Sequence, residues 1–405
     1  MLLVRCRNRR TSVCPSCSYE YAGDMWQLLY AGAAGGRKGV PETIRAHPLI
    51  FVTLTAPGFG AVHTTRADRH GRQGRCRPWG ESRLCPHRRP IWCTAVHAED
   101  DERLGTPLCG DCYDYPGHVA FNWWAPELWR RFTITLRRVL ARRLGLSVAE
   151  LSRCTRVSFA KVAEFQRRGV IHLHALIRLD GSDPFTPPDL AVTAADLAAA
   201  VEAASGAVQL FVHLPAEERP SLLRFGEQVD VQVISGGTGS ELTPERVAAY
   251  LAKYATKSAE DFGLGERRLS GLALDGIGVS AHVARIVRMA WDLGAADELV
   301  GLRRWLHMLG FRGHFATKSR GYSTTLGAIR RERGDYRRRQ VDDARPVGVQ
   351  DQVGDDTTLV IAHWEFAGLG HLTAGDAALA LSAAARARER REAARDHIRG
   401  GEEDN

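Results

Sequence analysis

Runs of apolar residues alternate with polar, turn-forming segments along the chain and predict both strands and helices. Short runs that are rich in β-branched residues and bounded by turn residues predict strands at residues 49–55, 155–162, 170–179, 208–214 and 229–234. Apolar residues that recur every three or four positions predict helices at residues 24–34, 130–143, 187–205, 243–257, 274–310 and 373–396. This mixture indicates an α+β fold.

Two of these strands are predicted to form a hairpin that aligns polar side chains on one face. The residues Arg167–Gly169 are typical of a three-residue hairpin loop with glycine in the left-handed position. If Gln166 then pairs with Val170, Glu164 lies opposite His172. A two-residue turn would instead move Glu164 to the other face, because successive strand residues alternate in direction.

The strand that leaves this loop carries two histidines separated by one apolar residue. Residues two apart on a strand point to the same face, so His172 and His174 present adjacent imidazoles. With Glu164, or alternatively with Gln166, they would offer ligands to a divalent metal ion that keeps open coordination positions. Considered alone, a His-x-His pattern is more simply explained by a hairpin with two half-buried histidines.

The predicted helix at residues 243–257 carries an unusual set of tyrosines and lysines. Thr243 is expected to cap its N-terminus, with Pro244 in the first helical position. At 3.6 residues per turn, two tyrosines and two lysines fall on adjoining faces, namely Tyr250, Tyr254, Lys253 and Lys257. These side chains could cover the sheet with their apolar parts, or they could supply a nucleophile beside cations.

The nine cysteines indicate metal binding rather than disulfides in a reducing compartment. Residues 61–118 show little apolar periodicity, so bound metal is the expected source of their stability. Zinc is the expected ion. One possible site joins the two CxxC pairs, Cys14, Cys17, Cys109 and Cys112. A second would join Cys76, Cys85 and Cys93 with either His87 or His97.

The net charge of +8 favours an anionic partner. The basic residues are unevenly distributed, since residues 66–89 hold eight arginines against two acidic residues. A second cluster includes residues 337–339. The two clusters together favour nucleic acid binding, while each alone could be a solvated surface. Four other basic residues are candidates for DNA contact, namely Arg167, Arg168, Lys318 and Arg320.

No segment approaches the roughly 18 apolar residues needed to span a bilayer, and the N-terminus lacks the charge order of a signal peptide. We therefore expect a cytoplasmic, nucleoid-associated protein. Met1 enters directly into a strand-like segment, so we expect the natural chain to start upstream. A phosphate-binding loop of the form GxxxxGK[ST] is absent. A helicase would therefore have to be a separate protein.

Three motifs together resemble those of HUH endonucleases, namely Phe51–Pro57, Gly169–His174 and Tyr250–Tyr254. More closely, the chain resembles the rolling-circle replication initiators of actinobacterial plasmids and integrative elements. This resemblance extends through Cys14–Cys17, Leu108–Tyr115 and His314–Lys318. It implies a central antiparallel sheet of about five strands with helices on one side.

The resemblance also implies metal-dependent, site-specific nicking of one strand of plasmid origin DNA. Tyr250 would form a 5′-phosphotyrosine and Tyr254 would act on the returning strand. Lys253 and Lys257 would assist, and Mg²⁺ or Mn²⁺ would be the catalytic ion, with Zn²⁺ structural. The implied partners are double- and single-stranded origin DNA, a host helicase and a host DNA polymerase. A second copy of the chain, through the C-terminal helix, is a further candidate.

The expected organisation places a zinc-knuckle region and helix at residues 1–48, a first nuclease strand at 49–60 and a zinc-binding insertion at 61–118. The nuclease domain would follow at 119–327, with a basic linker and helix at 328–405. Two alternatives remain, a two-tyrosine transposase or relaxase of the HUH class and a non-catalytic zinc-dependent DNA-binding regulator. Relaxases usually place the tyrosine before the histidines, which is not the order here.

Overall fold

A computed structural model describes residues 5–67, 71–77, 84–215, 218–234, 242–257, 259–264, 269, 278–343, 365, 368 and 370–403. The chain divides into two units, one of Tyr21–Ile329 and one of Met1–Glu20 with Arg330–Asn405. Several expected segments lie outside the described residues, including the loop at 235–240, the linker at 344–357, and residues 68–70 and 78–83 of the arginine-rich segment. None of the helices among the described residues has the length and hydropathy needed to cross a membrane.

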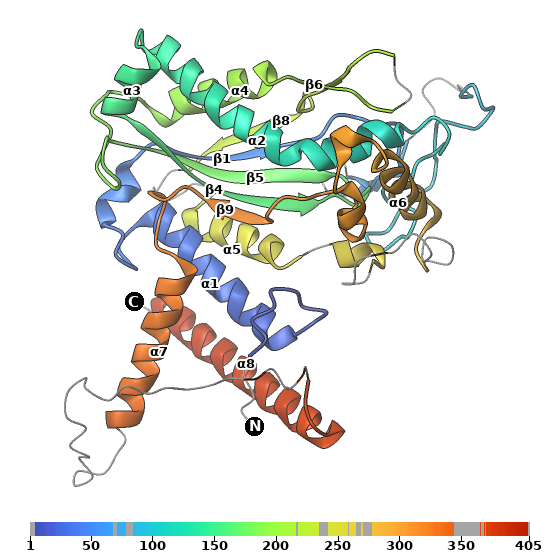
Figure 1. Ribbon diagram of the computed structural model, residues 1–405. Coiled ribbons are helices and arrows are strands. Elements are labelled where there is room, and N and C mark those ends of the chain that lie inside the picture. Colours follow the sequence, from blue (N-terminus) through green and yellow to red (C-terminus); the bar gives the residue numbers. More distant parts are fainter. Residues whose placement is uncertain are drawn as a thin grey trace. The chain divides into compact units, whose positions relative to one another are not determined.

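A five-stranded antiparallel sheet forms the centre of the Tyr21–Ile329 unit, in the order β8-β1-β5-β4-β9 (Figure 1). Its strands are β1 (Leu49–Leu54), β4 (Arg156–Phe165), β5 (Ile171–Asp180), β8 (Val229–Val233) and β9 (Ala316–Lys318). Two small sheets pair β2 (Arg66–Ala67) with β3 (Gln73–Gly74), and β6 (Leu210–Val212) with β7 (Ser221–Leu223). The α+β class and the five-stranded antiparallel sheet are confirmed. The edge strand β9 was not predicted, because its three residues show no clear periodicity.

The described helices are α1 (Pro15–Ala34), α2 (Tyr115–Arg143), α3 (Val148–Cys154), α4 (Ala194–Ala207), α5 (Pro244–Ala255), α6 (Ala281–Leu293), α7 (Leu326–Asp343) and α8 (Ala374–Glu403). Short 3₁₀ turns lie at Glu42–Ala46, Ala259–Phe262, Asp297–Leu299 and Leu302–Met308. The helix predicted at 187–205 was placed too early, because a capping box between Thr193 and Asp196 starts α4. The helix predicted at 274–310 was too long at its C-terminal end, because α6 ends at Leu293, with Gly294 as its C-cap, and 3₁₀ turns follow. Residues 274–277 of this prediction lie outside the described residues.

Helices cover both faces of the sheet, which corrects the expectation of helices on one side (Figure 1). The physical reason is that the central strands are apolar on both faces. In β1, Ile50, Val52 and Leu54 pack with α2, α4 and α6, while Leu49 and Phe51 pack with α1 and α5. In β5, Ile171 and Leu173 belong to the same hydrophobic core as Ile50, Val52 and Leu54. The two imidazoles of β5 therefore lie on the α1 and α5 face, by strand alternation.

Helix α1 lies close to the loop that follows β9. Tyr322 is fully buried, and its hydroxyl donates a hydrogen bond to Leu29 O at 3.0 Å. The guanidinium of Arg178, also fully buried, contacts Gly32 O and pairs with Asp180. The tyrosine ring occupies the space beside Gly32 that a Cβ atom would fill.

Gly32→Ala is therefore expected to destabilise this unit. A Cβ atom at this position would lie 2.2 Å from Tyr322 Cε1, so the ring or the helix must shift, at a cost of about 1–3 kcal/mol. The urea midpoint of unfolding measures the loss. Gly23→Ala in the same helix is the matched control, because nothing lies within 4 Å of its added Cβ. A gain of up to about 1 kcal/mol is expected there, and equal losses in both variants would contradict the packing argument.

The unit of Met1–Glu20 and Arg330–Asn405 contains the first turns of α1, most of α7, and α8. Residues 330–343 were predicted to be linker-like, and this was wrong, because they continue α7. Charge pairs within the helix, such as Arg338 with Asp335, support it despite its polar composition. Thr373 caps the N-terminus of α8, since its Oγ1 accepts a hydrogen bond from Asp376 N at 3.0 Å.

Candidate functional site

The hairpin between β4 and β5 has the three-residue loop expected from the sequence. Gln166 N donates to Val170 O at 2.8 Å, and Gly169 adopts a φ of 83°. The register pairs Glu164 with His172. Because only glycine adopts this φ without strain, Gly169 fixes the loop length, and the loop length places Glu164 on the same face as the histidines.

Buried side chains of α2 and α6 hold this loop in place. Asn122 Nδ2 donates to Gly169 O at 2.9 Å, and Asn122 Oδ1 accepts from Ile171 N at 3.0 Å. His118 Nε2 lies 3.0 Å from Gly169 O, and His282 Nε2 lies 3.0 Å from Arg168 O. Burial lowers the pKa of His118 to about 3 and that of His282 to about 4, so both act as neutral hydrogen-bonding groups. These partners were missed from sequence, since they contact the loop only in the folded chain.

His174 is held by contacts on both of its ring nitrogens. Its Nε2 lies 2.8 Å from Glu164 Oε2, and its Nδ1 lies 3.0 Å from Thr53 Oγ1 on β1. Its ring also stacks on Phe51 at a centroid distance of 6.0 Å. Beside the Glu164 carboxylate, Nε2 donates a proton. A metal ion bound at Nε2 would take the place of that proton, and Nδ1–H would then donate to Thr53 Oγ1, which is the usual arrangement for a ligating histidine.

His172 carries a buried ring nitrogen that lacks a partner. Its Nε2 accepts or donates no hydrogen bond among the described residues. Burial, and then the neighbouring His174, lower the pKa of His172 to about 3, so the imidazole is neutral. A neutral imidazole with a free buried nitrogen is suited to metal ligation. Gln166 is less suited, because its Oε1 already accepts a hydrogen bond from Arg168 Nε at 2.8 Å.

Both tyrosines of α5 lie against His174. The ring centroids of Tyr250 and Tyr254 are 5.5 and 5.8 Å from that of His174, and 4.6 Å from each other. The expected cap is present, since Thr243 Oγ1 accepts from Arg246 N at 3.4 Å. Tyr250 remains 41% exposed, so a large substrate can reach it.

The electrostatic surroundings of the tyrosines oppose ionisation without a further cation. Burial raises the pKa of Tyr254, and the negative charge of Glu164 raises it further. Burial also raises the pKa of Tyr250, with added effects from Tyr254 and Glu164. The ammonium groups of Lys253 and Lys257 lie 5.9 and 5.1 Å from the centre of the Tyr254 ring. The two lysines therefore flank Tyr254 directly.

Three further groups of cysteines and histidines bring their ligand atoms within 4.8 Å of one another. We call them the N-terminal cluster (Cys6, Cys14, Cys17), the histidine-rich cluster (His63, Cys76, Cys93, His97) and the cysteine-rich cluster (Cys85, His87, Cys109, Cys112). Each of these groups could hold a metal ion. Glu164, His172 and His174 are more widely spaced than this in the structure.

These clusters correct the pairings suggested by the sequence. The two CxxC pairs do not share a cluster, because Cys109 and Cys112 lie with His87, whose Nδ1 is 3.8 and 3.2 Å from their sulfur atoms. Cys85 joins the same group rather than that of Cys76 and Cys93. His63 was missed, since no neighbouring ligand marks it in the sequence.

The histidine-rich cluster is supported by a carboxylate. His97 Nε2 lies 3.1 Å from His63 Nδ1, and His97 Nδ1 lies 2.7 Å from Asp101 Oδ2. With the Nδ1 proton held by Asp101, His97 Nε2 is available as a ligand. The segment that follows abuts the hairpin between β4 and β5, since a Cβ on Gly105 would lie 2.4 Å from the Arg167 carbonyl carbon. This cluster therefore lies in a segment that supports the hairpin loop.

The four basic residues proposed to contact DNA differ in their surroundings. Arg167 and Arg320 are exposed. Arg168 is held in the fold instead, since it donates to Gln166 Oε1 and lies over the Phe59 ring. Lys318 donates to three backbone carbonyls, of Ser319, Arg320 and Ser323. Arg168 and Lys318 therefore have structural partners that the sequence did not reveal.

The sequence of the chain is similar to a known protein family. The family model described as "RepSA: Replication initiator protein, pSAM2" matches residues 1–385. A replication initiator protein of Streptomyces ambofaciens is 46% identical over 413 residues, which cover 98% of this chain and 83% of that relative. No solved structure matches the chain. The chain thus belongs to the RepSA family of replication initiator proteins.

Proposed function

We propose that this replication initiator is an HUH-type endonuclease that nicks one strand of its origin DNA through a tyrosine. The observation that carries the proposal is the placement of two tyrosines within 5.8 Å, between ring centroids, of a histidine that also contacts a carboxylate. Neither hydrophobic packing nor DNA binding alone requires this combination. It is the combination expected for a nucleophile beside a metal site.

The proposed metal ligands are His172 Nε2, His174 Nε2 and the Glu164 carboxylate. The buried, unpartnered His172 Nε2 fits this role. Glu164 and His174 would exchange their direct contact for contacts to the ion. When bound, Mg²⁺ or Mn²⁺ would polarise a phosphate oxygen and offset the developing charge at phosphorus. It would also offset the Glu164 charge that now raises the pKa of both tyrosines.

In the proposed step, the Tyr250 oxygen attacks the phosphorus of the scissile phosphodiester. A phosphorus–oxygen bond to tyrosine forms, and the bond from phosphorus to the 3′ oxygen breaks. The phenol loses one proton and the leaving 3′ oxygen gains one, so the products are a 5′-phosphotyrosine and a free 3′-hydroxyl. Because no bond is hydrolysed, the reverse reaction religates the strand. Tyr254, beside Lys253 and Lys257, is proposed to act on the returning strand.

The test is incubation of the full chain with single-stranded origin DNA and Mn²⁺, followed by a denaturing gel. A covalent protein–DNA band that depends on the metal ion is expected. A chelator serves as the control and should remove the band. Stable origin binding without any covalent product would favour the non-catalytic regulator instead.

We also propose that zinc occupies the histidine-rich and cysteine-rich clusters, since both offer four sulfur or nitrogen donors. In this proposal residues 61–118 read duplex DNA beside the nick, while the nuclease residues 119–327 act on the single strand. A host helicase and polymerase would extend the 3′-hydroxyl. Dimerisation through α8 is proposed from two large apolar side chains that it exposes, Leu379 and Leu381.

Replacing one ligand in each cluster is expected to remove one zinc ion. The purified chain should hold about two zinc ions in these four-donor sites, and Cys76→Ser and Cys109→Ser should each lower the zinc content by about one and lower the melting temperature. Cys154→Ser is the matched control, because Cys154 belongs to none of the three clusters. Metal analysis by mass spectrometry measures the content. Unchanged zinc content in Cys76→Ser would rule out zinc in the histidine-rich cluster.

A further inference from the structure

A cavity opens on the sheet face opposite the tyrosines. Its volume is about 410 Å³. It is formed by α2, β4, β9 and the loop before β9, and it is lined by Pro126, Glu127, Trp129, Arg130, Lys161, Arg312, Gly313, His314 and Thr317. None of these residues takes part in the proposed cleavage step.

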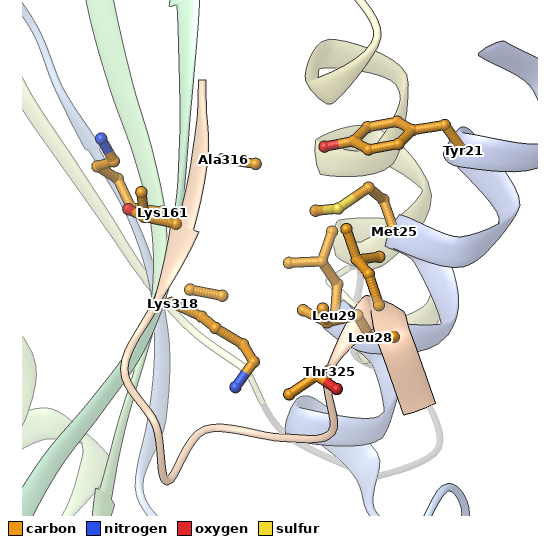
Figure 2. Close-up of a pocket in the computed structure, with 12 residues that line it drawn as sticks. Tyr21, Met25, Leu28, Leu29, Lys161, Ala316, Lys318 and Thr325 are labelled. Carbon is orange, nitrogen blue, oxygen red and sulfur yellow. The ribbon is translucent and has the colours of Figure 1, made fainter. Parts of the chain in front are cut away.

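Lys161 is the unusual residue of this cavity. It lies on β4, and strand alternation directs it to the face opposite Glu164. Its side chain is 4% exposed, and its Nζ donates only a long hydrogen bond, of 3.4 Å, to His314 O. Lys161 also borders an apolar cavity on the α1 face, together with Tyr21 and Met25, but Figure 2 shows its nitrogen turned away from these two residues.

A buried ammonium group without a carboxylate partner destabilises a fold. Burial alone lowers the pKa of Lys161 to about 8. The nearby Glu127 does not neutralise it, because that carboxylate is paired with Arg130 at 2.7 Å and Arg131 at 3.0 Å. Among the described residues, Lys161 has no ion pair, so packing gives no reason for a lysine here.

The rest of the cavity is suited to an anion attached to a flat ring. Arg312 lies at the rim, with its guanidinium 4.2 Å from the centre of the Trp123 ring. Trp129 borders the cavity and lies 5.9 Å from Lys161 Nζ. Cations beside an aromatic ring are the recurring features of sites for single-stranded nucleic acid.

We propose that this cavity binds a phosphate of single-stranded origin DNA, with the phosphate on Lys161 and the adjoining base against Trp129. The site is separate from the cleavage site, since the two lie on opposite faces of the sheet. It therefore binds a part of the strand other than the scissile phosphate at the tyrosines. The proposal needs only DNA binding by a replication initiator, so it stands or falls independently of the tyrosine chemistry.

The test measures DNA affinity and stability together in the full chain, for wild type and Lys161→Met. A single-stranded origin oligonucleotide is titrated with a chelator present, so that no cleavage occurs. Affinity should fall by about tenfold, and the slope of log affinity against log salt should become shallower by about 0.7. The melting temperature should rise, because methionine removes the buried charge.

Two further variants and one probe complete the test. Arg138→Met removes the same charge from an exposed position of α2 outside the cavity and should have a smaller effect on affinity. Arg312→Ala should weaken binding without unfolding, because Arg312 is exposed. Unchanged affinity in Lys161→Met, or a lowered melting temperature, would overturn the proposal. So would stabilisation of wild type by inorganic phosphate with no change in oligonucleotide affinity on substitution, since the site would then hold only a free anion.

Discussion

Tyr250→Phe is expected to abolish the covalent protein–DNA product, whereas Tyr254→Phe should still form it. Removing the phenolic oxygen removes the nucleophile, and the other tyrosine of α5 whose ring lies against His174, Tyr254, is proposed to act on the returning strand instead. The rate of adduct formation on a single-stranded origin oligonucleotide should therefore fall below detection. The fold should be unaffected, since Tyr250 is 41% exposed and phenylalanine keeps its edge contact with Phe51.

Tyr254→Phe provides the matched control on the next turn of the same helix. It should nick the origin strand but fail to join a second strand to the first, if its role is to act on the returning strand. The reverse pattern would exchange the roles of the two tyrosines. A covalent product in the double variant would contradict any role for α5 in the chemistry.

His172→Ala and Glu164→Ala are each expected to reduce metal-dependent cleavage by about a hundredfold or more. The reason is that each removes one of three ligands, and two ligands hold a divalent ion weakly. Activity at rising Mn²⁺ concentration measures the effect, and high Mn²⁺ should restore part of the activity. Gln166→Ala is the matched control, because its side chain contacts Arg168 rather than a histidine.

Full activity in Glu164→Ala combined with a loss in Gln166→Ala would show that the amide is the third ligand. If His172→Ala, Glu164→Ala and Gln166→Ala lose activity and no Mn²⁺ concentration restores it in any of them, the result would argue against a metal site here. Melting temperatures of the variants distinguish ligand loss from unfolding. His172→Ala should keep the fold, because the Nε2 of His172 has no partner to lose.

The local geometry of the site could be predicted from the sequence because short-range rules determine it. Strand alternation places His172 and His174 together, and a glycine in the left-handed position sets the loop. The Thr243 cap likewise follows from a local rule, and it begins the helix that carries the tyrosines. Each of these features depends on residues only a few positions apart.

Features that depend on long-range contacts could not be predicted. The cysteine clusters combine residues up to 34 positions apart, as with His63 and His97, so spacing gave the wrong groups. Arg168 and Lys318 look like DNA-binding residues in the sequence. In the structure, Arg168 donates a hydrogen bond to the Gln166 side chain and Lys318 donates one to the Ser323 carbonyl oxygen. The burial of the second sheet face likewise depends on α1 and α5, which are distant in sequence from the strands that they cover.

The most direct test of the tyrosine mechanism is to identify the residue that carries the DNA. Full-length protein is reacted with a short single-stranded origin oligonucleotide and Mn²⁺, digested with nuclease and protease, and analysed by mass spectrometry. The predicted result is a peptide from α5 in which Tyr250 carries a 5′-linked nucleotide. A nucleotide on a residue outside α5, or cleavage that leaves a 5′-phosphate with no modified peptide, would contradict the mechanism.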